Sequence, residues 1–264
     1  MILVTGAAGQ IGRLLRAGLP QHGWALRCHD IADLGAAGPC EELVQADVTD
    51  LAAFVAAAEG TTAIVHLGGN PKESPWEAIN RVNIEGTYNA FEAARLAGVP
   101  RVVFASSNHA VGFTPRARLA SVDVRARPDG YYGVSKAAGE ALGSLYADRY
   151  GLDVVCLRIG SQLPRPLRPR HLSTWLSDGD TVRLVHAALS APSPGFAVVY
   201  GISANSRGWW DLAPGRTLGY HPADDAEDFA AEVIAEHGEP DLAEVTEAFI
   251  GGEFCGPEYD ADRL

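Results

Sequence analysis

Lysine is scarce in this sequence, since only two of its 21 basic residues are lysines, Lys72 and Lys136. Basic residues as a whole are outnumbered by 33 acidic ones, which gives a net charge of −12 at pH 7. Such an excess of negative charge argues against general binding of nucleic acids or of anionic membranes. We therefore expect any anionic small-molecule partner to be bound by a local cation.

Long hydrophobic runs and paired cysteines are also missing. No apolar stretch approaches the roughly 20 residues that a membrane helix needs, and the N-terminus lacks the basic region and cleavage site of a secretory signal. We therefore expect a soluble, cytoplasmic protein with no membrane partner. The four cysteines contain no Cys-x-x-Cys pair, so the sequence predicts neither a disulfide framework nor a metal site; they are Cys28, Cys40, Cys156 and Cys255.

Short apolar strands alternate with helical stretches from the first residue onward. Strands are expected at residues 2–4, 25–28, 43–45, 63–67, 102–105 and 154–157. Helices are expected from about residue 10, after residue 50, from about 76 to 97, and through 136 to 150. This alternation is typical of βαβ units. The sequence thus predicts an α/β fold, a doubly wound parallel sheet of the Rossmann type with six or seven strands.

A glycine-rich loop, Thr5-Gly-Ala-Ala-Gly-Gln-Ile-Gly12, follows the first strand directly and leads into a helix. Gly6 would make a tight turn, Gly9 would let the backbone approach a pyrophosphate, and Gly12 would pack the helix on the strand. Gln10 and Ile11 complete the loop, whose helix N-terminus favours anions. A purely structural turn is the alternative, but the strand, loop and helix context favours binding of a dinucleotide.

Asp30 lies 18 residues beyond Gly12, at the end of the second predicted strand. A carboxylate there can accept hydrogen bonds from both hydroxyls of an adenosine ribose and would repel a 2′-phosphate. Neither Ile31 nor Ala32 is a cation that could bind such a phosphate. The pattern favours NAD over NADP, although Asp30 could instead cap a turn.

Residues at the ends of later strands should border the same cofactor. We expect these to be Asp47 and Val48 beside the adenine, the run Leu67, Gly68 and Gly69 where the backbone can approach, and Ile159.

The sequence changes in character after Gly160, where it becomes rich in proline and arginine and then contains Trp209, Trp210 and a late predicted helix over 224–236. Ligands of a doubly wound sheet lie beyond the carboxyl ends of its strands, so this part should cover them as a small C-terminal substrate cap. We expect a single domain over 1–264, with 1–160 forming mainly the NAD-binding core and 161–264 mainly the cap and the last helix.

Tyr132 and Lys136 stand four residues apart near the start of a long predicted helix, so the phenol and the ammonium lie on one face, one turn apart. Removal of a hydride from an alcohol needs a base for the hydroxyl proton. A phenol can act as this base if its pKa falls, which we expect Lys136 and the charged nicotinamide of NAD to promote. Tyr131 has no cation at this spacing and is assigned to packing.

A polar run, Ser106-Ser-Asn-His109, follows the strand at 102–105. It should lie at the carboxyl edge of the sheet, where a reacting hydroxyl would be bound.

These motifs together resemble the extended short-chain dehydrogenase/reductase superfamily, as does Asn83-Ile-Glu-Gly-Thr87. Five further stretches, at 104–109, 126–130, 157–161, 172–176 and 208–211, are similar to the uronate dehydrogenase family. The resemblance extends over nearly the whole chain. It implies oxidation of a hexuronate, glucuronate or galacturonate, at its anomeric carbon to an aldarolactone, with NAD as the hydride acceptor.

The resemblance also implies roles for individual residues. Tyr132 would be the base, Lys136 would lower its pKa and hold the nicotinamide ribose, Ser107 would position the reacting hydroxyl, and Asn83 would support a proton-relay water. The remaining residues would contact the sugar, with the last of them paired to its carboxylate; they are Asn108, His109, Ser161 and Arg170.

Three of these assignments have alternatives. Arg170 could be a solvated charge in an arginine-rich loop, although a guanidinium suits a carboxylate well. His109 could be a packed loop histidine rather than a sugar contact. Pro71 stands where the family is expected to have a small hydroxyl residue, and proline offers neither a hydroxyl nor an N–H.

Two other functions fit the same motifs. A sugar-nucleotide epimerase or dehydratase uses the same tyrosine and lysine, but such enzymes usually carry a larger C-terminal lobe than the roughly 100 residues that follow Gly160 here. A non-catalytic NAD-sensing protein would commonly lack Tyr132 or Lys136. The resemblance also implies a homo-oligomer, with self-association through the two long helices.

Overall fold

The structure is a computed structural model that describes residues 1–116, 119–241 and 243–259. Its centre is one sheet of seven parallel strands in the order β3-β2-β1-β4-β5-β6-β9. The strands are β1 (Ile2–Thr5), β2 (Leu26–Asp30), β3 (Glu41–Gln45), β4 (Ile64–His66), β5 (Arg101–Ser107), β6 (Asp153–Ile159) and β9 (Phe196–Gly201). The strand order reverses between β1 and β4, the position at which ligands bind in such sheets. The predicted doubly wound fold is confirmed.

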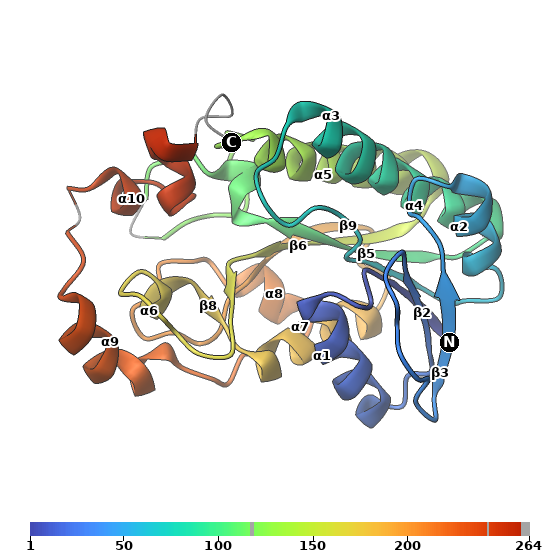
Figure 1. Ribbon diagram of the computed structural model, residues 1–264, viewed down its shortest axis with the longest axis horizontal. Coiled ribbons are helices and arrows are strands. Elements are labelled where there is room, and N and C mark those ends of the chain that lie inside the picture. Colours follow the sequence, from blue (N-terminus) through green and yellow to red (C-terminus); the bar gives the residue numbers. More distant parts are fainter. Residues whose placement is uncertain (117–118, 242, 260–264) are drawn as a thin grey trace.

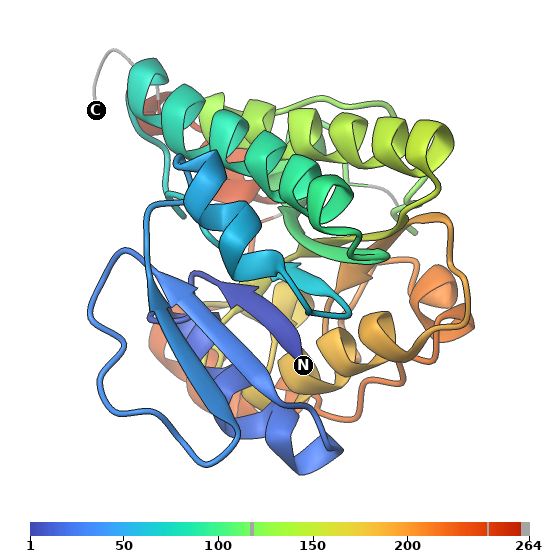
Figure 2. The ribbon, with the colours of Figure 1, turned by 90° about the vertical axis from the view of Figure 1, so that its right-hand side faces the viewer.

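Helices cover both faces of this sheet (Figures 1 and 2). One face carries α2 (Leu51–Ala58), α4 (Gly86–Ala97) and α5 (Tyr131–Tyr150). The other carries α1 (Gln10–Gly18), α7 (Asp178–Ser190) and α8 (Ala213–Thr217). The central strands β1, β4, β5 and β6 are mostly buried and rich in valine, isoleucine and leucine, as parallel strands with two covered faces require, whereas the edge strand β3 is only partly buried. Two apolar cores result, one on each face.

The predicted helix over 76–97 is continuous but not uniform. It begins as α3 (Trp76–Ala78), widens into a π-helical segment, η2 (Ile79–Glu85), and continues as α4. Helices α4 and α5 end as predicted, at Gly98 and Gly151, which adopt left-handed φ values of 70° and 71°. A side chain at either position would strain the backbone, so glycine fixes where these helices stop.

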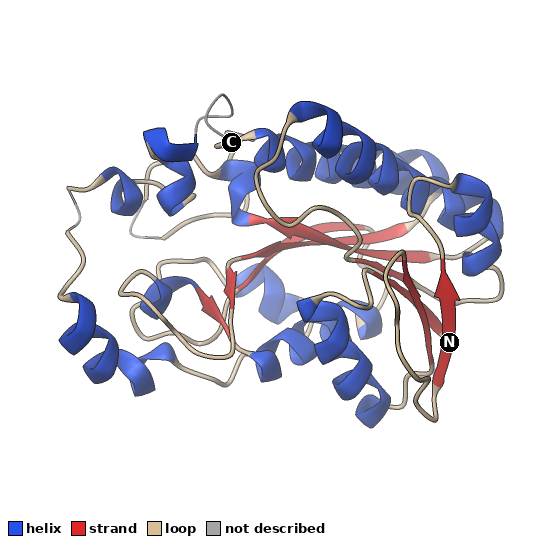
Figure 3. Ribbon diagram, in the orientation of Figure 1, coloured by secondary structure: helices blue, strands red, loops and turns tan. Residues whose placement is uncertain are grey.

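Short elements beyond the carboxyl edge of the sheet form the cap, on the left of Figures 1 and 3. They are β7 (Ser161–Gln162), α6 (His171–Thr174), β8 (Trp175–Leu176), α9 (Ala230–His237) and α10 (Val245–Ala248). Short 3-10 turns complete the chain: η1 (Leu19–His22), η3 (Asn108–Val111), η4 (Ala226–Phe229), η5 (Gly252–Cys255) and η6 (Pro257–Tyr259). The late helix expected over 224–236 is thus divided between η4 and α9.

Part of the chain beyond residue 160 belongs to the core rather than to the cap. Strand β9 pairs with β6 at the edge of the sheet, and α7 packs beside α1. Apolar residues of α7, among them Leu184 and Val185, are buried in the core on that face. The sequence change at Gly160 therefore marks the first entry into the cap and not the end of the core.

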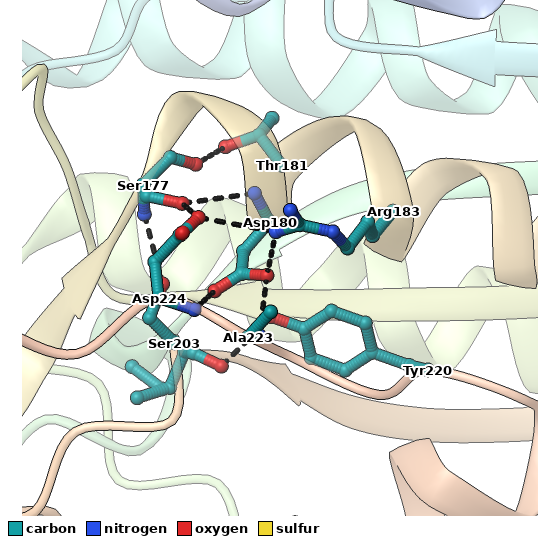
Figure 4. A network of polar contacts seen from close by, with 9 residues as sticks. Ser177, Asp180, Thr181, Arg183, Ser203, Tyr220, Ala223 and Asp224 are labelled. Atoms are coloured by element: carbon teal, nitrogen blue, oxygen red, sulfur yellow. Dashed lines mark hydrogen bonds and ion pairs between the residues drawn. The ribbon is translucent and has the colours of Figure 1, made fainter.

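A buried carboxylate, Asp180, ties α7 to the segment that leads into the cap (Figure 4). Its Oδ1 accepts the backbone N–H of Ala223 at 2.9 Å and Nη1 of Arg183 at 2.5 Å, and its Oδ2 accepts the N–H of Asp224 at 3.1 Å. Ser177 caps the same helix by accepting the N–H of Asp180 at 2.9 Å. Both oxygens of this fully buried side chain are thus satisfied.

No helix in the described part of the chain is long and apolar enough to cross a membrane.

Candidate active site

A cavity of about 700 Å³ opens at the carboxyl edge of the sheet. Every residue predicted to contact the cofactor lines it, and these are Gly6, Gly9, Gln10, Ile11, Gly12, Asp30, Ile31, Asp47, Val48, Leu67, Gly68, Gly69, Tyr132, Lys136 and Ile159. The fold thus brings together short motifs that lie up to about 150 residues apart in the sequence. Within residues 1–116, 119–241 and 243–259, no cluster of three or more His, Cys, Asp or Glu side chains is arranged to hold a metal ion.

The glycine loop has the geometry of a phosphate cradle. Gly6 has a φ of +67°, and a Cβ there would lie 2.9 Å from the backbone nitrogen of Gly68. A Cβ at Gly12 would lie 2.3 Å from the carbonyl oxygen of Gly6. Gly9 is the N-cap of α1 and offers no side chain, and the first turn holds no acidic residue. The positive end of this helix therefore remains available to an anion, as a dinucleotide pyrophosphate requires.

Asp30 is held in place by the backbone on both sides. Its Oδ2 accepts the N–H of Ala8 and its Oδ1 accepts the N–H of Ala32, each at 2.9 Å. Each carboxylate oxygen has a second lone pair, so the group can still accept two ribose hydroxyls. The neighbouring Ile31 is 65% exposed and uncharged. The residues present fit NAD better than a cofactor with a 2′-phosphate.

Tyr132 and Lys136 face the cavity from the first turns of α5. Lys136 Nζ lies 5.3 Å from the centre of the Tyr132 ring and donates to the carbonyl oxygen of Ala105 at 2.8 Å. Burial lowers the pKa of Lys136 to about 8. Burial also raises the pKa of Tyr132 to about 12, while a hydrogen bond with Ser107 lowers it and the charge of Asp129 raises it. The expected net fall in the Tyr132 pKa is therefore not found in the protein alone, because desolvation of the phenolate outweighs the other effects.

The polar run 106–109 begins in the last two residues of β5, which extends further than predicted, and continues directly into η3. Ser107 caps this turn by accepting the N–H of His109 at 3.2 Å, and both residues line the cavity. Asn108 does not line it, because its side chain is buried and donates to the carbonyl oxygen of Ile250 at 3.1 Å. A sugar contact by Asn108 would need this bond to the C-terminal segment to change.

Asn83 lies in the π-helical segment η2, behind the cavity wall. Its Oδ1 accepts the N–H of Asn70 at 2.7 Å, and its Nδ2 donates to the carbonyl oxygen of Asn70 at 2.9 Å and to Ser135 Oγ at 3.3 Å. The side chain thus fixes the loop that carries Asn70 and Pro71, both of which line the cavity. Support of a relay water by Asn83 stays a prediction.

The Arg170 guanidinium donates hydrogen bonds to backbone carbonyls of the C-terminal segment. Its Nη1 donates to the carbonyl oxygen of Thr246 at 2.7 Å, and its Nη2 donates to those of Phe249 and Ile250 at 3.0 and 2.6 Å. It does not line the cavity, and Glu247 Oε2 lies 3.6 Å away. These contacts correct the view of Arg170 as a freely solvated loop charge, and three of its five N–H groups hold the C-terminal segment.

Ser161 also lies outside the cavity lining, in β7. Its Oγ is 2.8 Å from Thr174 Oγ1, and Thr174 Oγ1 in turn lies 3.3 Å from the carbonyl oxygen of Arg170. Of the predicted sugar contacts, the structure therefore places Ser107, His109 and Tyr132 at the cavity and Asn108, Ser161 and Arg170 in the shell behind it.

Glu73, which the sequence did not reveal, caps α5, the helix that carries Tyr132 and Lys136. Its two carboxylate oxygens accept the N–H groups of Tyr131 and Tyr132 at 2.8 and 2.9 Å. A carboxylate at a helix N-terminus is stabilised by the helix dipole. Glu73 lies 58 residues before Tyr131, and no local capping pattern could reveal it. The second residue missed is Asp129, whose Oδ2 lies 2.7 Å from Nδ1 of His109.

Residues 2–172 match the model of a family described as "NAD dependent epimerase/dehydratase family". The chain belongs to this family. It is 47% identical to uronate dehydrogenase of Agrobacterium fabrum, and the match covers 96% of each chain. A crystal structure of glucuronic acid dehydrogenase from Chromohalobacter salexigens has 43% identity and a TM-score of 0.92 over 96% of each chain. A mutant of uronate dehydrogenase from Agrobacterium tumefaciens, complexed with NAD, has 46% identity and a TM-score of 0.91, also over 96% of each chain.

These comparisons confirm several predictions. The resemblance to uronate dehydrogenases, the NAD-dependent enzyme class and the Rossmann fold are all confirmed. The roles of individual residues, which the resemblance implies, remain predictions.

Proposed function

We propose that this protein oxidises the anomeric hydroxyl of a hexuronate, glucuronate or galacturonate, to an aldarolactone. The observation that carries the proposal is that Tyr132 and Lys136 open into the same cavity as the glycine loop and Asp30. Similarity to uronate dehydrogenases over 96% of the chain supports the substrate class. When bound, NAD supplies the acceptor for the hydrogen and the two electrons that leave the anomeric carbon.

The protein's own part in the reaction is to hold the sugar and to take up a proton. Tyr132 accepts the proton of the anomeric hydroxyl, and Ser107 favours the charged form of Tyr132 by hydrogen bonding. Lys136 is mostly charged below its pKa of about 8 and then stabilises a phenolate beside it. The cavity residues of the glycine loop and Asp30 would hold the cofactor.

The substrate carboxylate needs a cation, since the chain carries a net charge of −12. We assign this role to Arg170, whose carbonyl partners take three of its five N–H groups, while Glu247 Oε2 lies 3.6 Å from Nη1. Asn108, His109 and Ser161 would contact the sugar hydroxyls, and Asn83 would support the relay water. We further divide the single domain into an NAD-binding part, mainly 1–160, and a cap, mainly 161–264.

The assembly and location complete the proposal. Large apolar side chains of α4 and α5 are exposed, among them Tyr88, Leu96, Leu145 and Tyr150, and pairing of these helices between copies would cover them. We therefore propose a homo-oligomer. The four cysteines are all unpaired, as suits the reducing cytoplasm.

Formation of NADH, followed by its absorbance, tests the function directly. Galacturonate and glucuronate should support turnover with NAD, whereas glucose and UDP-glucose should not, and NADP should replace NAD poorly. Equal rates with glucose and glucuronate would rule out carboxylate recognition. Turnover of UDP-glucose in preference to either uronate would favour the sugar-nucleotide alternative.

A further inference from the structure

A second acid–base pair lies beside Tyr132 in the cavity wall. The Nδ1 atom of His109 is 2.7 Å from Oδ2 of Asp129, which lies two residues before α5. The His109 side chain is 16% exposed and lines the cavity, whereas the Asp129 side chain is completely buried. The pair thus connects the cavity with a carboxylate that solvent does not reach.

Asp129 is enclosed by backbone on three sides. A Cβ at Gly112 or Gly251 would lie 1.9 or 1.8 Å from its Oδ2, and a Cβ at Gly133 would lie 2.9 Å from its Oδ1. Only glycine fits at such distances, so the three segments hold the carboxylate rigidly. Such close approach fixes the direction in which Oδ2 meets His109.

The buried carboxylate of Asp129 makes few contacts that would stabilise the fold. Its Oδ1 makes no hydrogen bond within the described residues, and a buried charged oxygen without a partner is costly. The charge of Asp129 also raises the pKa of Tyr132, which works against the base. Its interaction with His109 is therefore the contact that explains a carboxylate here.

The His109 ring packs against two aromatic rings. It meets the Tyr132 ring edge to face at 5.7 Å between centres and lies 4.0 Å from the centre of the Phe254 ring. With Nδ1 facing Asp129, Nε2 is the remaining hydrogen-bonding atom of the ring. An ionised carboxylate can only accept, so Nδ1 carries the proton, and Nε2 of the neutral ring must then be an acceptor.

We propose that Asp129 is a positioning residue that holds His109 in the Nδ1–H tautomer, so that Nε2 accepts a hydrogen bond from a substrate hydroxyl beside Tyr132. The inference rests on the proposed function and deepens it. It makes the site selective for a hydroxyl donor at that position of the sugar, because an ether, a deoxy carbon or a carbonyl oxygen cannot donate to Nε2.

Two measurements test the proposal. The first uses ¹⁵N NMR of the imidazoles, with the His109 signals identified by their loss in His109→Gln. Wild type should show the Nδ1–H tautomer, and Asp129→Asn should lose the preference for it, because an amide can either donate or accept. This readout needs neither substrate nor turnover.

The second measurement is a double-mutant cycle on kcat/KM for the uronate, taken on the plateau of the pH profile. Asp129→Asn should lower kcat/KM about tenfold, mainly through KM, and leave NAD binding unchanged. In the His109→Gln background the same change should alter kcat/KM by less than about twofold, because the coupling partner is gone. Asp123→Asn, at an exposed site shortly before Asp129, is the matched control and should change neither quantity.

Three outcomes would contradict the proposal or the function on which it rests. An Nε2–H tautomer of His109 in wild type would overturn the proposal even if Asp129→Asn failed to fold. Equal effects of Asp129→Asn with and without His109 would mean that Asp129 acts structurally and not through the ring. Failure of wild type to oxidise either uronate would instead sink the proposed function, and with it the sugar contact, while leaving the tautomer result to stand.

Discussion

Two buried carboxylates, Asp180 and Asp129, occupy opposite situations in this molecule. Both side chains are fully inaccessible to solvent. Asp180 accepts two backbone N–H groups and an arginine N–H, so both of its oxygens are satisfied. Asp129 meets one ring nitrogen and leaves Oδ1 without a partner among the described residues.

The contrast separates a structural region from a functional one. The Asp180 network joins α7 to the segment that enters the cap, and both carboxylate oxygens of Asp180 have partners within the protein (Figure 4). At the cavity edge, Tyr132, Lys136 and His109 keep hydrogen-bonding capacity for a ligand, and burial shifts the pKa values of the first two in directions that oppose charge. Polar groups left partly unsatisfied next to a cavity are candidates for function.

The first change removes the proposed base in the functional region. Tyr132→Phe should lower kcat by about 10³-fold, since it removes the base while keeping the buried ring. NAD binding and thermal stability should stay near wild type. Steady-state kinetics and a melting curve measure both, and Tyr131→Phe, beside it on the exposed side of the helix against Trp76, is the control that should keep full activity. Substantial turnover by Tyr132→Phe would show that the proton acceptor is another group.

The second change removes the buried carboxylate of the structural region, Asp180. Asp180→Ala should cost about 3 kcal/mol of unfolding free energy, because two backbone N–H groups and Arg183 lose a fully buried acceptor. For a chain of this size that corresponds to a fall in Tm of about 6 °C, with kcat per folded molecule close to wild type. Asp228→Ala, at an exposed position, should leave Tm unchanged. A loss of kcat larger than the loss of stability would place Asp180 in the functional region after all.

Arg170 has both a structural and a predicted functional role. It holds the C-terminal segment and is also predicted to bind the substrate carboxylate. Arg170→Ala should raise KM for the uronate about tenfold or more, as expected for a lost charge-assisted hydrogen bond, and lower Tm as well. Arg165→Ala, a half-exposed arginine of the same loop paired with Glu232, should do neither. A lower Tm with an unchanged KM would make Arg170 purely structural.

The last change tests how Ser107 affects the pKa of Tyr132 and should have the smallest effect. Ser107 lowers the pKa of Tyr132, so Ser107→Ala should raise that pKa further. Because oxidation needs the unprotonated phenol, the midpoint of the kcat/KM profile should move to higher pH. Ser106→Ala removes a hydroxyl that donates to Glu140 at 2.6 Å instead, and its midpoint should not move. A shift to lower pH in Ser107→Ala would contradict the assigned interaction.

Much of the fold followed from local patterns. Apolar runs separated by amphipathic stretches predicted the parallel sheet, and Gly98 and Gly151 end their helices where expected because only glycine adopts the left-handed conformation freely. The change in composition at Gly160 did not show that α7 and β9 pack in the core. Composition marks where the chain leaves the sheet, but it does not show where a later strand finds a free edge.

The cofactor side of the site was predictable for the same reason. Except for Tyr132 and Lys136 in α5, its residues lie at the end of a strand or in the segment just after one, and parallel strands bring their carboxyl ends to one edge. The substrate side of the site was harder to predict from the sequence. Asn108, Ser161 and Arg170 bond to segments that lie far away in sequence, and no local pattern shows how a polar side chain divides its hydrogen bonds between the protein and a ligand.

The sequence alone thus determined the sheet, the phosphate loop, Asp30 and the pairing of Tyr132 with Lys136, because each depends on spacing within one strand, loop or helix. The contacts of Glu73 with the start of α5, of Asp129 with His109 and of Arg170 with the C-terminal segment depend on the tertiary structure. These contacts join residues 58, 20 and about 80 positions apart. Their energies come from burial and hydrogen bonding that exist only once the chain has folded.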